Sequence, residues 1–158
     1  MLPEFAIDYL QWVFVSAFAA FQFVAAKNRL RGLMLVREFP LLTMVAALVL
    51  MVFAAVVYFV SEPRNQPDGG VGLDANEQGR WFAIAAASAI AVTAMVTSVI
   101  NHRWGAEHAW DEASGEAPPS GVAWLQRTTF ARALAVRVRF ALRAQSSVAG
   151  VDQSQGGR

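Results

Sequence analysis

One stretch of the chain, residues 41–60, contains no charged residue, no glycine and no proline. Its only polar side chains are those of Thr43 and Tyr58. A helix of this length spans about 30 Å at roughly 1.5 Å per residue, which matches the hydrocarbon core of a bilayer. Because a helix that is apolar on every side cannot face water, this stretch predicts an integral membrane protein.

Two more hydrophobic segments are expected to cross the membrane, at about residues 5–26 and 81–100. Only 16% of the residues are charged, against about 25% in a soluble domain. The predicted fold is therefore an all-α integral membrane protein with three transmembrane helices in a domain of residues 1–105. A polar loop at residues 61–80 is expected to join the second and third spans outside the cytoplasm.

The charges near the first span predict how the chain sits in the membrane. Four basic residues fall between positions 27 and 37, and basic loops stay in the cytoplasm. The N-terminus carries Glu4 and Asp8 and no basic residue in front of the apolar segment, unlike a secretory signal. We therefore expect the first segment to be retained, with the N-terminus outside and the C-terminus inside.

A basic amphipathic helix is expected near the C-terminus, at about residues 122–144, after an acidic, proline-containing linker at 106–121. It has five arginines and no acidic residue, so it is expected to lie on an anionic membrane surface or a partner rather than to span. The tail at 145–158 has a composition typical of disorder. The arginines expected to contact anionic lipid or a partner share one face: Arg132, Arg139 and Arg143.

Polar and small residues inside the spans predict where helices pack together. Gln11 and Gln22 are eleven residues apart, which at 100° per residue returns to within about 20° of the same direction. An amide facing lipid is costly, so both are expected to face another helix. Small and polar residues also repeat every four positions in the third span, where they allow close helix approach; these are Ala85, Ala89, Thr93, Thr97 and Asn101.

The sequence offers little for catalysis, cofactors or metals. There is no cysteine, and the two histidines, His102 and His108, lie outside the apolar segments, where a solvated histidine is favoured over a haem ligand. Asp68, Asp74 and Glu77 do not have the spacing of a calcium loop; Asp74 and Glu77 fit a helix-capping box better. We therefore expect no enzyme, no cofactor and no metal site.

Two functions remain open. The first is a small non-catalytic accessory or scaffold subunit of a membrane protein assembly in the plasma or inner membrane, with the lipid bilayer and other membrane subunits as partners. The second is a self-associating transport or permeation module. The net charge of +1 disfavours nucleic-acid binding. The permeation path would be lined by Gln11, Gln22, Thr93 and Thr97.

Overall fold

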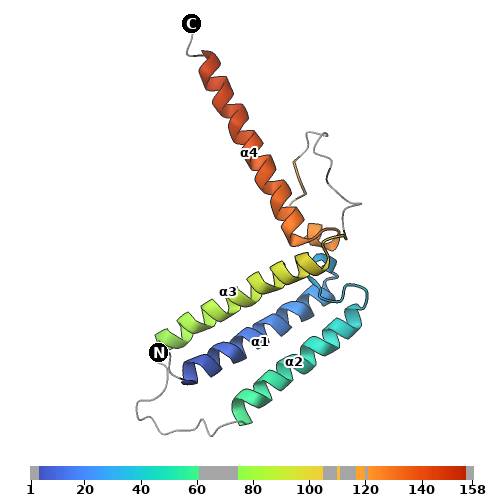
Figure 1. The fold of residues 1–158 in the computed structure, drawn as a ribbon, viewed down its shortest axis with the longest axis vertical. Coiled ribbons are helices and arrows are strands. Elements are labelled where there is room, and N and C mark those ends of the chain that lie inside the picture. The colour runs from blue at the N-terminus through green and yellow to red at the C-terminus, as the bar shows by residue number, and fades with distance from the viewer. Residues whose placement is uncertain (1–3, 61–74, 105–109, 111–116, 120, 156–158) are drawn as a thin grey trace.

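The computed structural model describes residues 4–60, 75–104, 110, 117–119 and 121–155. This part of the chain is helical and contains no strand. Three long helices lie side by side, with α1 between α2 and α3 (Figure 1). A fourth helix leaves their common end. In chain order the elements are α1 (Glu4–Lys27), the short 3₁₀ turn η1 (Arg31–Leu33), α2 (Pro40–Val60), α3 (Ala75–Ile100), the 3₁₀ turn η3 (Val122–Gln126) and α4 (Phe130–Gln155).

The three spans predicted from the sequence are confirmed as helices that are long and apolar enough to cross a membrane. The chain is a multi-pass membrane protein. The ends of the first two helices differ from the predicted spans by at most one residue, whereas α3 begins at Ala75, six residues before the predicted span. Glu77 lies in the first turn of α3, where a carboxylate favours the positive end of the helix dipole. Residues 61–74 of the predicted loop, Asp74 among them, lie outside the described residues.

Helix α2 packs on α1 through a narrow strip and exposes the rest of its surface. The buried residues include the small Ala47 and Ala54, with Thr43 and Tyr58 at the two ends. The valines, leucines and phenylalanines around them are mostly more than half exposed, a surface that only lipid or another apolar chain can cover. Two alanines on the packed strip let the backbones of α1 and α2 approach closely.

The predicted C-terminal helix is present, but its bounds differ from the predicted ones. It begins at Phe130, after the separate turn η3, and continues to Gln155, where the sequence predicts a helix at 122–144 followed by a disordered tail. Trp124, Thr128 and Thr129 are buried, and their burial against the bundle outweighs the local helical pattern that would continue through them. Once the first turns of α4 are formed, each further residue adds a hydrogen bond, which carries the helix into the predicted tail.

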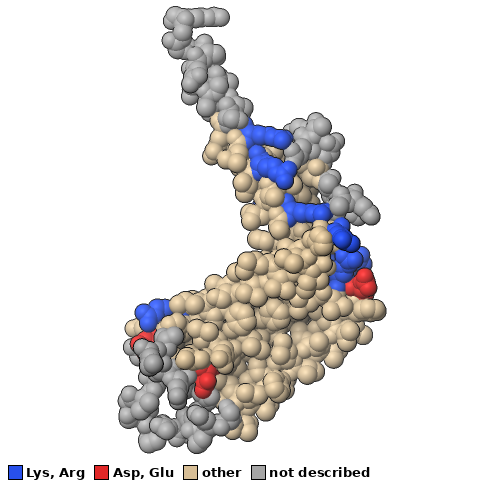
Figure 2. Space-filling model, viewed as in Figure 1, with Lys and Arg blue, Asp and Glu red and all other residues tan. Residues whose placement is uncertain are grey.

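The overall shape is a bundle with one arm. Helix α4 crosses the direction of the three spans instead of continuing it (Figure 1). In the view of Figure 2, the face of the bundle between its two ends shows no charged side chain, while basic side chains gather where α4 begins and along one edge of α4. Of the basic residues that the structure describes, Arg80 alone belongs to the opposite end of the bundle, near the start of α3. The charges therefore mark the two ends of the apolar layer.

Candidate functional site: the junction between the bundle and α4

The connection between α1 and α2 is held by an amide from inside the first span. The side chain of Gln22 donates from Nε2 to the Leu33 carbonyl at 3.0 Å and accepts from the Leu35 N–H at 3.0 Å. Gln22 is buried, and both halves of its amide are satisfied by backbone groups, one bond being buried and the other partly buried. The predicted packing role of Gln22 therefore has a specific partner here, the backbone of the connection.

A second amide reaches the same connection from the residue that directly follows α3. Nδ2 of Asn101 donates to the carbonyl of Met34 at 3.0 Å, and Met34 is completely buried. Gln22 and Asn101 thus bind three consecutive residues, 33–35, from two separate parts of the chain. These side chains take the place of water as hydrogen-bond partners of the connection's backbone, and we call residues 33–35 the platform.

The turn η3 sits directly on that platform because residue 32 is a glycine. A Cβ atom at Gly32 would overlap the carbonyl oxygen of Thr128 and would come within 2.9 Å of the Leu125 carbonyl oxygen. Leu125 also packs against the small apolar core formed by the end of α1 and the connection. Backbone-to-backbone contact across almost a hundred residues of sequence therefore fixes η3, and with it the start of α4.

The first turn of α4 is bound to the end of α3. The Ala131 N–H donates to Oγ of Ser98 at 3.1 Å, so a hydroxyl from another helix satisfies one of the N–H groups that a helix start leaves open. Nη2 of Arg132 donates to the His102 carbonyl at 2.6 Å. These two bonds set the direction in which α4 leaves the bundle.

Beyond this turn, α4 presents an apolar ridge to the outside. Its members repeat every four residues and are between 40% and 60% exposed: Phe130, Leu134, Val138 and Leu142. Arg139 and Arg143 are exposed on the other side of the helix, together with Arg132, which is partly covered by its contact with α3. On the remaining side, the rings of Phe140 and Trp110 are perpendicular, with centroids 6.3 Å apart, and Arg137 donates to the Pro119 carbonyl at 3.0 Å.

The small-residue ridge predicted in α3 is buried along its whole length, from Ala85 to Asn101, and α1 is the span that packs beside it. Within α3, Oγ1 of Thr93 donates to the Ala89 carbonyl and Oγ1 of Thr97 to the Thr93 carbonyl, both at 2.7 Å. Such bonds to the preceding turn are common for threonine in helices, and they satisfy both hydroxyl protons.

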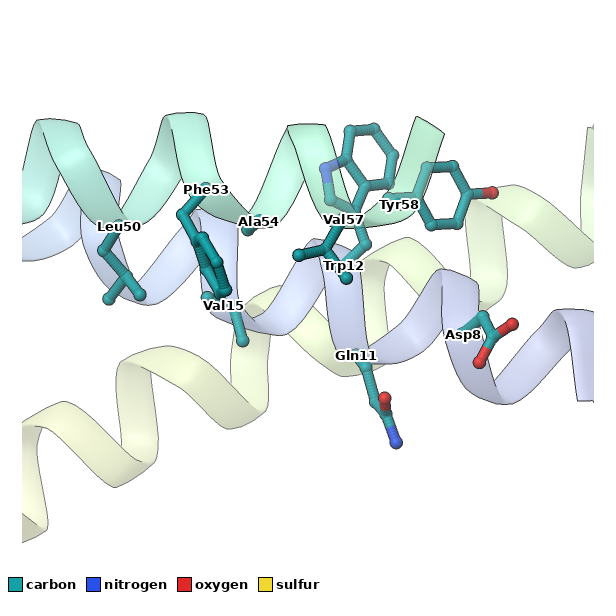
Figure 3. Close-up of a pocket in the computed structure, with 9 residues that line it drawn as sticks. All are labelled: Asp8, Gln11, Trp12, Val15, Leu50, Phe53, Ala54, Val57 and Tyr58. Carbon is teal, nitrogen blue, oxygen red and sulfur yellow. The ribbon is translucent and has the colours of Figure 1, made fainter. Parts of the chain in front are cut away.

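Gln11 is placed differently from Gln22. It is exposed, and it lines a groove of about 300 Å³ between α1 and α2, at the end of the bundle far from α4. Figure 3 shows Trp12 lying against α2 while Gln11 points away from that helix. Trp12 stacks on Tyr58 with ring centroids 4.6 Å apart. Its indole N–H is buried without a hydrogen-bond partner in the described part of the chain, so the groove combines apolar walls with one unsatisfied donor.

Periodicity finds Gln22, the α3 ridge and the α4 arginines, but it does not find the contacts that build the junction. Gly32 and Ser98 act through partners at least 30 residues away, and Trp124 is buried. Two sequence features could have pointed to these contacts: Gly32 lies within a basic connection, and Trp124 comes just before the arginine-containing helix. Among the described residues, no three His, Asp or Glu side chains are grouped to hold a metal ion.

Comparison with protein family models, curated proteins and solved structures finds no match to this chain.

Proposed function

We propose that this protein is a non-catalytic accessory or scaffold subunit of a membrane protein assembly, and that its bundle holds α4 along the cytoplasmic surface of the cell membrane. The observation that carries the proposal is the direction and surface of α4. The helix crosses the spans at their end (Figure 1) and leaves an apolar ridge uncovered. A helix with an apolar ridge and an arginine face is typical of membrane surfaces and of docking on partner helices.

Approximate free energies support binding of the exposed surface of α4 to a membrane or to a partner. Each ridge side chain is about half exposed, so covering it is worth roughly 1 kcal/mol, half the value of full burial. Each arginine close to an anionic leaflet adds about 1 kcal/mol. Together these contributions exceed the conformational entropy lost when the side chains become ordered on binding, because the junction already fixes the first turn of α4.

The orientation in the proposal follows from the distribution of positive charge. The basic residues of the α1–α2 connection, the end of α3 and α4 lie at one end of the bundle, and among the described residues Arg80 belongs to the other end. Positively charged loops stay in the cytoplasm, which favours an outside N-terminus and an inside C-terminus. Reporter fusions at positions 70 and 150 test this: a cytoplasmic reporter active at position 70 contradicts it.

The scaffold role is tested by purification in mild detergent with mass measurement of the complex. The variant Leu134→Ser with Val138→Ser removes part of the ridge, and Val136→Ser is the matched control because Val136 lies off the ridge and is already half-buried. We expect a stoichiometric partner that the ridge variant loses and the control keeps. A homo-oligomer without a foreign subunit favours the permeation module. A monomer that binds nothing contradicts both functions.

The permeation module remains the alternative, and the positions of its four proposed lining residues limit where a pore could run. Gln22, Thr93 and Thr97 lie inside the subunit with their side chains bonded to backbone, and Gln11 is exposed. A pore between copies would therefore present Gln11, and one through the subunit would have to break the bonds of the other three. The scaffold role requires neither change.

A further inference from the structure

A polar pocket lies beside the junction, where the end of α1 meets η3. Its volume is about 400 Å³. Four of its lining residues are basic, the other two are amides, and none is acidic; they are Lys27, Asn28, Arg29, Arg31, Gln126 and Arg127. None of the four basic side chains has an acidic partner among the described residues. Like charges gathered in this way repel one another, so an anion in the pocket would offset an unfavourable arrangement already built into the fold.

One of these cations, Arg29, lies on strained backbone at the end of α1. The Leu30 N–H bonds to the Ala25 carbonyl at 2.8 Å and the Arg29 N–H to the Ala26 carbonyl at 3.1 Å, the pattern of a Schellman cap. Arg29 is the left-handed residue of this cap, with φ of 54°. Glycine is the residue that adopts this conformation without strain. An arginine there adds strain to the backbone and adds a guanidinium to the pocket.

The far wall of the pocket is brought in by the junction. Nε2 of Gln126 donates to the Asn28 carbonyl at 3.3 Å, and Gly32 lets η3 approach closely. Arg127 thereby joins three cations that lie about a hundred positions earlier in the chain. The backbone that carries these cations is thus held in place by packing between two segments, while the side chains themselves are exposed.

The position of the pocket identifies the anion. Lys27 is the last residue of a membrane-spanning helix, so the pocket lies at the level of the lipid head groups. Guanidinium groups bind phosphate oxygens through paired hydrogen bonds, and basic pockets at the ends of spans bind phospholipid head groups. We propose that this pocket binds the phosphate head group of an anionic phospholipid. The site requires only that α1 spans the membrane and does not depend on the scaffold role or on where α4 docks.

The test uses the full chain in a neutral detergent, with native mass spectrometry to count bound lipid. Cardiolipin, phosphatidylglycerol and phosphatidylcholine are added in separate titrations, and inorganic phosphate and pyrophosphate serve as free anions. We expect the two anionic lipids to bind and phosphatidylcholine not to bind. Equal binding of all three lipids overturns the proposal. Free phosphate that displaces cardiolipin at equal concentration overturns the lipid assignment.

Two matched variants separate the pocket from general positive charge. The change Arg29→Gln with Arg31→Gln and Arg127→Gln is expected to weaken anionic lipid binding about a hundredfold, the value of three basic residues near an anionic group. The same loss of charge outside both the pocket and α4, by Arg37→Gln with Arg80→Gln and Arg103→Gln, is expected to leave it within about twofold. Equal losses in both variants contradict a built site. If the scaffold proposal fails, the pocket variant still loses lipid.

A single substitution guards against misfolding as the cause. Arg29→Gly suits the left-handed backbone at this position, so it keeps the helix cap while it removes one cation. We expect an unchanged or higher melting temperature together with lipid binding weakened about fivefold. Unchanged lipid binding, or a melting temperature that falls along with the binding, would show that Arg29 serves the fold and not a ligand.

Discussion

The substitution Gly32→Ala tests whether backbone contact fixes α4 to the bundle. The added methyl group would overlap the Thr128 carbonyl oxygen and lie 2.9 Å from that of Leu125. Both atoms belong to the backbone and cannot rotate away, so the substitution is expected to fall toward the upper end of the roughly 1–3 kcal/mol for overpacking. Alanine also restricts the unfolded chain, which offsets about 0.5 kcal/mol. The net expectation is about 2 kcal/mol, a roughly thirtyfold larger open population of the junction.

Hydrogen–deuterium exchange in detergent measures this opening. The amides of Arg127, Thr128 and Ala131 are bonded in the junction and should exchange roughly thirtyfold faster in Gly32→Ala, while those of α1 remain protected. Gly79→Ala is the matched control, because a Cβ at Gly79 meets nothing within 4 Å and alanine favours the helix. Unchanged protection in Gly32→Ala would refute the close contact between η1 and η3.

The remaining predictions concern hydrogen bonds that join elements. Gln22→Leu leaves the Leu33 carbonyl and the partly buried Leu35 N–H without their partner and should lower stability by about 2–4 kcal/mol, measured by thermal unfolding in detergent. Gln11→Leu, at an exposed position, should change stability by less than about 0.5 kcal/mol. Similar effects of the two substitutions would contradict the different environments of the two glutamines. Ser98→Ala removes the acceptor for the Ala131 N–H and should destabilise the first turn of α4 by about 1 kcal/mol. Hydrogen–deuterium exchange of the Ala131 amide should then be faster. Unchanged exchange of this amide would show that the Ser98 hydroxyl does not cap α4.

The spans can be predicted from composition because the lipid core requires apolar side chains and a backbone whose hydrogen bonds are all made within the protein. Residues 41–60 must be helical and must cross, whatever the rest of the chain does. The amphipathic character of the C-terminal segment is also local, so its arginine face is visible in the sequence. The first residue of α4 is set by tertiary contacts rather than by local sequence. Trp124 and Thr129 are buried in the junction, and this burial ends η3 and moves the start of the helix to Phe130.

The partners of polar groups are the part that the sequence does not supply. Helical geometry puts Gln11 and Gln22 in the same direction, but only Gln22 lies beside the α1–α2 connection, whose backbone needs donors and acceptors. Asn101 finds the Met34 carbonyl across 67 positions. Periodicity along one helix predicts which face is buried, whereas the identity of the neighbour depends on how the connection folds.

The most direct test of the proposed function is a depth measurement along α4. The chain has no cysteine, so single cysteines introduced at Leu134, Val138, Arg139 and Arg143 can each carry one spin label in liposomes that contain anionic lipid. If α4 lies along the membrane, labels at Leu134 and Val138 should be accessible to oxygen and shielded from a water-soluble relaxant, and labels at Arg139 and Arg143 should show the reverse. Full exposure of all four positions to the water-soluble relaxant, with no partner bound, would contradict the account.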